Sequence, residues 1–272
     1  MRMRLKSNIH THSTFVDGRD APEAMVEAAL KLGFHTLGFS EHGVAEYDDC
    51  SLSPAAEKEY RREILRLRTE YADRIQLLLG YEHDWLSPFP EYPYDYVIES
   101  VHYLRAGGEV FSVDNTPEIL KTAIERHYGG DPYAMCRAYF RTVAESCEKS
   151  PARFLGHIEL VMKFNERRDL FDDADPRYLA CALEAADSAA DSGKFVEINT
   201  GAIAKGYRTQ PYPGPAMLRR LAERGAPVIF SSDCHDARYL DCGFDDAQAL
   251  AKACGFRTAW QMRGDALEEF PL

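Results

Sequence analysis

The chain has 272 residues, of which 45% are hydrophobic and 28% charged, and its formal net charge is −12. This length fits one large α/β-barrel domain, although two small domains remain compatible with it. The acidic balance argues against a surface that mainly grips nucleic-acid backbone, while a local basic pocket is not excluded. The chain has neither a membrane-length apolar run nor an apolar signal-peptide core, so we expect a cytoplasmic protein with no membrane partner. Seven cysteines at irregular spacing, without a C-x-x-C pair, do not indicate a disulfide framework.

Short apolar runs alternate with amphipathic stretches along the chain. After the first run, RLKSNIH, we predict a helix with Asp20 as N-cap, Pro22 and Glu23 in its first turn, and Gly33 as its end. Six more runs read as strands, namely HTLGFSEH, IQLLLGYEH, YDYVIESVHY, RFLGHIE, KFVEINT and APVIFSSDCH. Between and after them, helices are expected over 54–72, 117–127, 132–148, 176–192, 215–224 and 245–253. Seven strands separated by helices indicate a parallel sheet, and the lack of a G-x-G-x-x-G loop favours a closed or nearly closed barrel.

Potential metal ligands lie at the carboxyl ends of these predicted strands. His10 and His12 flank a single residue, so both side chains would lie on one face of a strand. Alone, each such residue is more often a solvated or capping group than a ligand. Together they predict a mixed nitrogen and oxygen site, suited to zinc, manganese or iron, at one mouth of the barrel. The further candidates are Asp17, His42, Glu82, His102, His157, Asp233 and His235.

Three histidines are expected to lie elsewhere. His35 precedes the second strand at its opposite end, and His83 faces away from its neighbour Glu82. His127 lies in the connection ERHYGGDP, whose loop could close over the mouth as a lid. Cys234 is also predicted to face away from the site by strand alternation.

The motifs NIHTHSTFVDG, GFSEHG, GYEHDW, ESVHY, GHIELVMKF, EINTGAIAKG and SSDCH occur in the order typical of the PHP superfamily, named for polymerase and histidinol phosphatase. The chain resembles the stand-alone histidinol-phosphatase branch over nearly its whole length. This resemblance implies a single PHP metallophosphoesterase domain over residues 1–272, with an α/β fold that is a distorted, TIM-like barrel of seven strands. It also implies three metal positions, the first held by His10, His12, Glu82 and Asp233, the second by Glu82, His102 and His157, and the third by Asp17, His42 and His235.

Two motifs depart from the family pattern. SSDCH has a cysteine where the family usually has alanine, on the face that carries no ligand. The segment after His157 commonly carries two adjacent basic residues, and Met162 replaces the first of them, leaving Lys163. This second change bears on the contacts to phosphate.

The resemblance implies hydrolysis of a small phosphomonoester, with L-histidinol phosphate of histidine biosynthesis as the expected substrate. Two or three divalent ions of manganese, iron or zinc would lower the pKa of a bridging water toward about 7, and the hydroxide would attack phosphorus in line. Asp17, Glu82, Asp233 and His235 are the expected catalytic residues. Lys163, Lys205 and Arg208 are expected to neutralise the phosphoryl oxygens, although Arg208 fits a solvated surface role equally well. No general acid for the leaving alkoxide is identified.

Two alternatives stay open. The first is a PHP phosphoesterase that acts on nucleotides or short oligonucleotides, which the acidic net charge disfavours only mildly. The second is a catalytically silent metal-binding module, which complete occupancy of the ligand positions disfavours. The amine and imidazole of histidinol would suit an acidic mouth, for which the loop residues Glu46, Asp48 and Asp49 are candidates, although a solvated loop is the commoner role.

Overall fold

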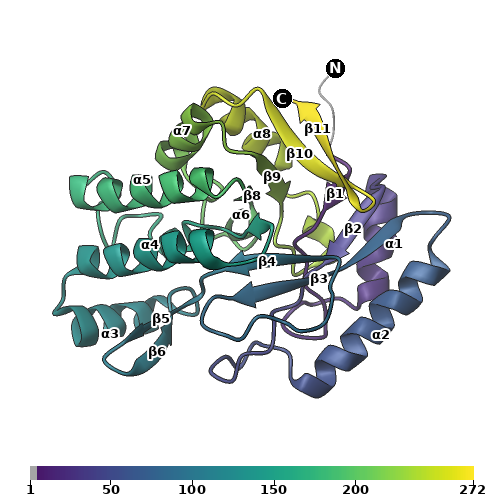
Figure 1. Ribbon diagram of the computed structural model, residues 1–272, viewed down its shortest axis with the longest axis horizontal. Coiled ribbons are helices and arrows are strands. Elements are labelled where there is room, and N and C mark those ends of the chain that lie inside the picture. The colour runs from purple at the N-terminus through teal and green to yellow at the C-terminus, as the bar shows by residue number, and fades with distance from the viewer. Residues whose placement is uncertain (1–4) are drawn as a thin grey trace.

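A curled sheet with helices on its outer face dominates the computed structural model, which describes residues 5–272 (Figure 1). Within this range the sheet has nine strands, whose spatial order follows the chain. They are β1 (Ser7–Asn8), β2 (Thr36–Phe39), β3 (Gln76–Asp84), β4 (Tyr96–Ser100), β7 (Phe154–Leu155), β8 (Phe195–Asn199), β9 (Val228–Ser231), β10 (Thr258–Arg263) and β11 (Ala266–Pro271). A separate hairpin consists of β5 (Tyr103–Ala106) and β6 (Glu109–Ser112).

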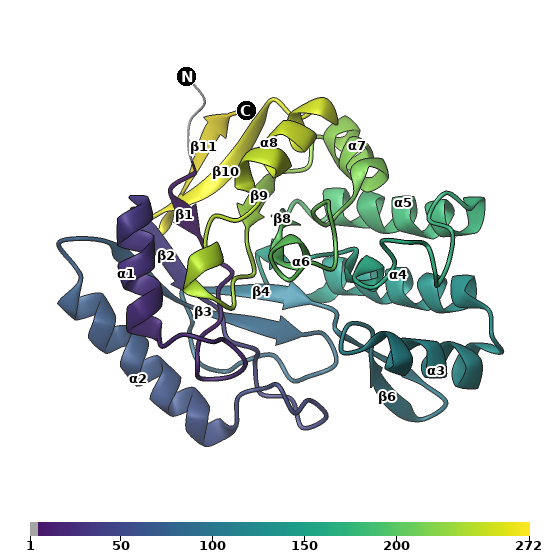
Figure 2. The same ribbon diagram turned by 180° about the vertical axis from the view of Figure 1, so that it is seen from behind.

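The helices alternate with the strands and lie around the sheet. They are α1 (Pro22–Leu32), α2 (Pro54–Glu70), α3 (Pro117–Tyr128), α4 (Pro132–Lys149), α5 (Pro176–Asp191), α6 (Gly201–Ala204), α7 (Pro215–Arg224) and α8 (Phe244–Ala253), with 3₁₀ turns η1 (Leu160–Met162) and η2 (Ala237–Tyr239). Seen from behind, α1 and α2 cover one side and α4, α5 and α7 the other, with α6 between them beside β8 (Figure 2). In residues 5–272, no helix is long and apolar enough to cross a membrane.

The sheet curls far enough for the segments that follow β1 and β9 to meet at the mouth. Within the nine-stranded sheet, all neighbours pair in parallel except β11, which runs antiparallel to β10. Beyond β1 and β9, the His12 N–H donates to the carbonyl of Cys234 at 2.8 Å, and the Cys234 N–H donates to the carbonyl of His10 at 3.1 Å. The predicted α/β barrel is therefore confirmed, and residues that follow different strands meet at one end of it.

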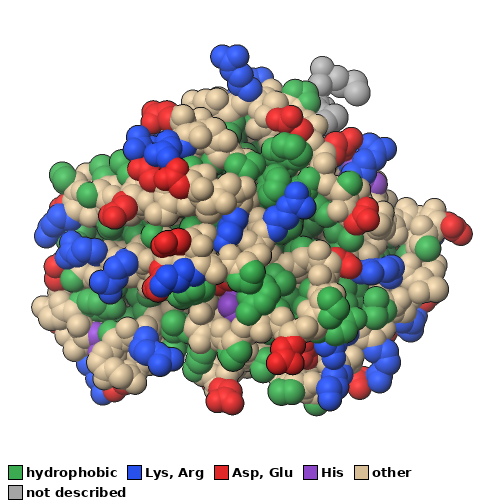
Figure 3. Space-filling model, in the orientation of Figure 1, with side chains coloured by type: hydrophobic (Ala, Val, Ile, Leu, Met, Phe, Trp, Pro, Cys, Tyr) green, Lys and Arg blue, Asp and Glu red, His purple; other side chains and the backbone are tan. Residues whose placement is uncertain are grey.

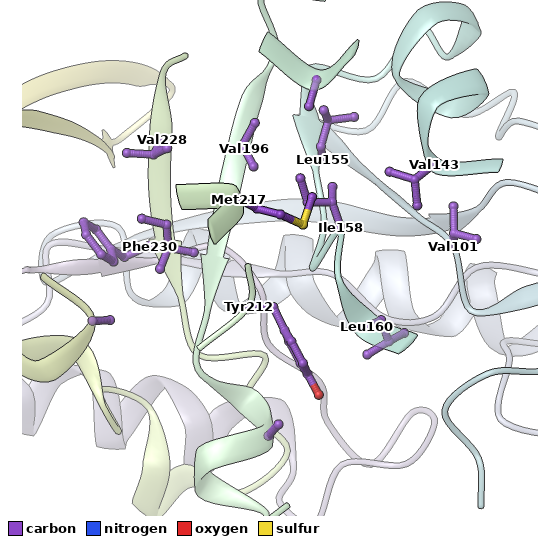
Figure 4. Close-up of a cluster of buried hydrophobic side chains, with 14 of the residues drawn as sticks. Val101, Val143, Leu155, Ile158, Leu160, Val196, Tyr212, Met217, Val228 and Phe230 are labelled. Atoms are coloured by element: carbon purple, nitrogen blue, oxygen red, sulfur yellow. The ribbon is translucent and has the colours of Figure 1, made fainter. Parts of the chain in front are cut away.

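Alternate strand residues divide between two apolar clusters. The smaller cluster includes Leu78, Ile98, Phe154 and Ile229 and contains no helix residue, so it fills the inside of the barrel. Residues of the opposite strand face, such as Val196, Val228 and Phe230, belong to the larger cluster, which also contains helix residues such as Met217 (Figure 4). This alternation directs every second side chain inward, and polar side chains replace apolar ones inside the barrel toward the carboxyl ends of the strands.

All seven predicted strands are present as β1 to β4 and β7 to β9, although Arg4 of the first run lies outside the described residues. The predicted count of seven is wrong, because β10 and β11 extend the sheet to nine. These two strands form a hairpin that turns at Gly264, whose φ of 66° suits glycine. Every predicted helix is present within about two residues of its expected bounds.

The predicted N-cap of α1 is wrong. Ala21 occupies that position, without a side-chain cap, and Pro22 begins the helix. The Asp20 carboxylate instead accepts a hydrogen bond at 2.9 Å from the N–H of Ala237, which follows β9. A long-range donor thus takes the oxygen that a local cap would use. Gly33 ends α1 as predicted, with a φ of 74°.

Candidate metal centre

The nine predicted ligands meet at the carboxyl ends of the barrel strands. His10, His12 and Asp17 follow β1, His42 follows β2, and Glu82 lies on β3, while His102, His157, Asp233 and His235 follow later strands. Their donor atoms form four overlapping groups, each with all atoms within 4.8 Å of one another. The groups are His12, Asp17, His42 and His235; His10, His12 and Asp233; His10, Glu82 and His157; and His42, Glu82 and His102.

Glu82 lies at the centre of the cluster and is fully buried. Burial alone would raise the pKa of its carboxyl, but the positive potential of the adjacent imidazoles holds that pKa well below its usual range. The carboxylate is therefore ionised and central to several donor groups. Five imidazole nitrogens surround it, those of His10 at 3.2 Å, His12 at 3.5 Å, His42 at 2.9 Å, His102 at 3.3 Å and His157 at 2.9 Å.

Buried carboxylates behind the cluster orient its histidines. Glu197 on β8 lies 2.6 Å from Nδ1 of His10, which leaves Nε2 facing Glu82 and Asp233. Asp84 accepts the backbone N–H of His102 at 2.8 Å and lies 3.5 Å from its Nδ1. A carboxylate on one ring nitrogen fixes the tautomer and directs the other nitrogen's lone pair toward an ion.

Several buried ring nitrogens of the cluster lack hydrogen-bond partners and are suited to coordinate a metal ion. Nε2 of His10 and both ring nitrogens of His12 are buried without a hydrogen-bond partner in the described chain. Leaving such atoms unpaired is costly, so a ligand at this position would relieve the cost. Burial, with the nearby His235 and His42, lowers the pKa of His12 to about 3, and the neutral ring keeps a lone pair for coordination. Nitrogen and oxygen donors without thiolate suit divalent transition metals.

Asp17, His42 and His235 form the outer part of the cluster. Asp17 lies 3.1 Å from Nε2 of His235 and 4.0 Å from Nε2 of His42. Burial would raise the pKa of Asp17, but the bond to His235 and the charge of that ring lower it below its usual value. The Nζ of Lys205 lies 3.3 Å from the same His235 nitrogen.

The backbone around Asp233 is specialised to bring its carboxylate into the cluster. Asp233 adopts a left-handed conformation with a φ of 46°, which is uncommon for a residue other than glycine. Gly201 provides the space beside it, since a Cβ at that position would lie 2.8 Å from the Asp233 Cβ.

A cavity of about 210 Å³ opens above the cluster. Lys163 and Lys205 line it, as do the carboxylates of Asp48 and Asp114. The Nζ of Lys163 donates to the Asp114 carbonyl at 2.7 Å and to its carboxylate at 3.0 Å. The cavity wall therefore contains two lysines that could bind a phosphate group, and also carboxylates that could bind a cationic substituent.

Other predicted contacts lie off this cavity. Arg208 does not line it, because its guanidinium donates to the Met162 carbonyl at 3.2 Å and pairs with Glu166 at 3.3 Å. Of the three acidic loop residues proposed from the sequence, only Asp48 lines the cavity, whereas Glu46 and Asp49 do not.

The three histidines predicted to lie elsewhere are outside the cluster. His83 pairs with Glu99 at 2.9 Å, and His35 lies 3.0 Å from the hydroxyl of Thr36. His127 belongs to α3 rather than to a connection, and its ring stacks on Phe111 at 5.5 Å.

Sequence reasoning missed several residues of this region. Glu197 and Asp84 behind the ligands, and Asp114 and Tyr212 in the cavity wall, were not among the predicted residues. Glu197 carries a detectable signal, because a charged residue inside the buried strand FVEIN needs a partner. Asp114 and Tyr212 lie in loops, where no periodicity marks a functional position.

Taken together, the barrel, the ionised central carboxylate and the surrounding imidazoles define a site of the metallohydrolase class. Residues 8–201 match the PHP domain family, and the chain belongs to this family. A Deinococcus radiodurans protein named "Probable histidinol-phosphatase" is 32% identical over 93% of this chain and 94% of its own length. The histidinol-phosphatase of Bacillus subtilis is 27% identical over 85% and 94%, respectively.

A solved structure has the same fold. It is the histidinol phosphate phosphatase of Lactococcus lactis in complex with zinc, L-histidinol and phosphate. Its TM-score is 0.73, with 22% identity over 97% of this chain and 98% of that one. The likeness confirms the barrel architecture over nearly the whole chain.

Proposed function

We propose that this protein is a metal-dependent phosphatase that hydrolyses L-histidinol phosphate to L-histidinol and inorganic phosphate. The observation that carries the proposal is the ionised Glu82 among five imidazoles beneath a cavity lined by both lysines and carboxylates. The names of the Deinococcus and Bacillus relatives, which align along most of the chain, support the substrate. We further propose that residues 1–272 form one PHP domain, since one continuous sheet runs from β1 to β11.

Two or three ions of manganese, iron or zinc are proposed to occupy the overlapping donor groups. His10, His12, Glu82 and Asp233 would hold one ion, Glu82, His102 and His157 a second, and Asp17, His42 and His235 a third. When bound, such ions activate water and neutralise charge on phosphoryl oxygens. In this proposal the catalytic role of Asp17, Glu82, Asp233 and His235 is to position the ions relative to the phosphate. One donor group supports the first ion through His10, His12 and Asp233, another supports the third through Asp17, His42 and His235, and Glu82 belongs to two groups that contain His157 and His102 separately.

The two lysines are proposed to bind the phosphoryl group. Lys205 lies beside His235 and is exposed to the cavity, so its ammonium is available to an anion. Lys163 is held by Asp114, which fixes its position but offsets part of its charge. Arg208, by contrast, is engaged by Glu166 and Met162 and is not proposed as a phosphate contact.

The organic part of the substrate is proposed to lie against the acidic wall. Histidinol carries an amine and an imidazole, and the carboxylates of Asp48 and Asp114 complement these groups. A polyanionic oligonucleotide would meet repulsion from the same wall. Acidic and basic side chains also intermingle on the face shown in Figure 3, whereas a nucleic-acid surface would favour a continuous basic patch. The cytoplasmic location stays a prediction.

Hydrolysis assays with manganese-loaded and chelator-treated protein test the proposal. The substrates are L-histidinol phosphate, AMP, a short oligonucleotide and p-nitrophenyl phosphate. We expect kcat/KM for histidinol phosphate to exceed that for AMP at least tenfold, which equals about 1.4 kcal/mol of transition-state discrimination. We also expect chelation and Glu82→Gln to abolish turnover. Faster release of phosphate from AMP would favour the nucleotide phosphoesterase, and metal binding without any turnover would favour the silent module.

A further inference from the structure

One buried hydroxyl in the cavity wall has no partner in the structure. Tyr212 follows α6 and is 2% exposed, yet it is one of the residues that line the cavity. Its Oη accepts and donates no hydrogen bond within the described chain. A buried hydroxyl without a partner costs about 1–3 kcal/mol relative to a satisfied one, so a phenylalanine would pack in this position at lower cost.

The Tyr212 ring is held firmly, which fixes where the hydroxyl points. Its backbone N–H donates to the Asn199 carbonyl at 2.9 Å, and its carbonyl accepts the Asn199 N–H at 2.8 Å. The ring belongs to the large cluster of buried apolar side chains, and its oxygen lies at the far end from the backbone (Figure 4). Leu160 and Lys163 line the same cavity. The hydroxyl is therefore carried on a rigid support, in the wall of the cavity that also contains a lysine proposed to bind phosphate.

Two other buried hydroxyls, those of Ser112 and Tyr60, differ from that of Tyr212 because they have hydrogen-bond partners. Ser112 donates to Asp114 at 3.0 Å, and Tyr60 donates to two backbone carbonyls at 2.8 and 2.9 Å. Burial, together with the charges of Asp114 and Asp233, raises the pKa of Tyr212 well above its usual value and outweighs the opposing effect of Arg208. Tyr212 thus keeps its proton at any pH at which the enzyme would work.

We propose that the Tyr212 hydroxyl donates a hydrogen bond to a phosphoryl oxygen of the bound ester and of the phosphate product. A phosphoryl oxygen is an acceptor only, so it matches this unpaired donor, and Lys163 lines the same cavity. Tyr212 would then be a catalytic residue that contacts the substrate directly. The inference rests on the proposed phosphatase function and adds a specific contact to it.

Tyr212→Phe tests the proposal because it removes the hydroxyl and leaves the ring. Metal-loaded wild type and variant are compared in binding of inorganic phosphate by calorimetry and in kcat/KM with p-nitrophenyl phosphate and histidinol phosphate. We expect both quantities to fall about 10- to 100-fold, the range for one hydrogen bond to a charged acceptor. The melting temperature should stay equal or rise, since an unsatisfied buried hydroxyl is removed, and metal content should not change.

Tyr60→Phe is the matched control, because it removes a buried hydroxyl that the fold itself uses. It should lower the melting temperature and leave phosphate affinity unchanged. Unchanged phosphate binding and turnover in Tyr212→Phe, alongside an active wild type, would overturn the assignment of Tyr212 alone. A metal-loaded wild type that neither binds phosphate nor hydrolyses any ester would overturn the proposed function as well.

Discussion

Replacing Glu197 with glutamine should weaken metal binding although Glu197 is not itself a predicted ligand. One carboxylate oxygen accepts from Nδ1 of His10 at 2.6 Å and from the Ser231 hydroxyl. The other accepts from the backbone N–H of His157 at 2.8 Å and from the Asn199 amide at 2.9 Å. All of these donors are buried, so the side chain needs an acceptor at both of its ends.

A glutamine can accept at one end only, and either orientation carries a cost. If its amide nitrogen faces His157 and Asn199, two buried donors lose their acceptor, at about 1–3 kcal/mol each. If the amide nitrogen faces His10, Nδ1 must become the acceptor and the proton moves to Nε2. That is the nitrogen that faces Glu82 and Asp233, and a protonated nitrogen cannot coordinate an ion.

We therefore expect Glu197→Gln to lower metal affinity about 10- to 100-fold, as is usual when the partner of a coordinating histidine is changed. Competition titration of metal-free protein against a chromophoric zinc chelator measures this affinity directly, and thermal melting checks that the variant is folded. Glu99→Gln is the matched control, since Glu99 is equally buried at 2% exposure and also pairs with a histidine Nδ1, that of His83 at 2.9 Å. His83 lies outside the cluster, so this variant should lose stability but keep its metal affinity. Equal metal affinities in the two variants would refute the reasoning.

Two further predictions concern the acidic wall of the cavity. Asp48→Asn should lower kcat/KM for histidinol phosphate about three- to tenfold and leave kcat/KM for p-nitrophenyl phosphate within about twofold, because only the first substrate carries cationic groups. The control Asp49→Asn, at a position off the cavity, should change neither value. Equal losses on both substrates in Asp48→Asn would contradict the assignment. Burial would raise the pKa of Asp114, but Lys163 and His102 hold it below its usual value of about 3.9, so its ion pair stabilises the fold above that pH and is lost as pH falls through the folded pKa. The difference in unfolding free energy between metal-free wild type and Asp114→Asn should therefore be constant above about pH 5 and shrink below about pH 4 in denaturant titrations, and a gap that widens on acidification would show the reverse sign.

The sequence predicts the strands well, and also which side chains meet at the mouth, because both depend on local patterns. An apolar run that ends in histidine or a carboxylate marks a strand end, as GFSEH does for His42 and LLLGYE does for Glu82. Parallel barrel topology then brings such ends to one mouth without further information about the packing. The hairpin of β10 and β11 shows the same kind of signal, with alternation in TAWQMR and a turn at Gly264, and it could have been predicted.

The supporting contacts depend on the order and curvature of the sheet, and local patterns do not contain that information. Glu197 reaches His10 across 187 positions of the chain, and Asp20 serves Ala237 instead of the nearby helix end. Arg208 illustrates the same limit, because the sequence left a phosphate contact and a solvated surface role equally open, whereas Glu166 and Met162 engage its guanidinium. In each case a distant partner competes with the local role that the sequence suggests.

The charge of the mouth explains how an acidic chain can handle an anionic substrate. Only three of the nine proposed ligands, Asp17, Glu82 and Asp233, are carboxylates, so two divalent ions would already exceed their negative charge and three would exceed it further. Histidine supplies the remaining donors without adding negative charge when neutral. Lys163 and Lys205 then add positive charge to the cavity wall, while Asp48 and Asp114, the second of which pairs with Lys163, add carboxylates to it. Under the proposed function, we expect these charges to orient a phosphate ester with a cationic tail, its phosphoryl group toward the metal ligands and its amine toward Asp48.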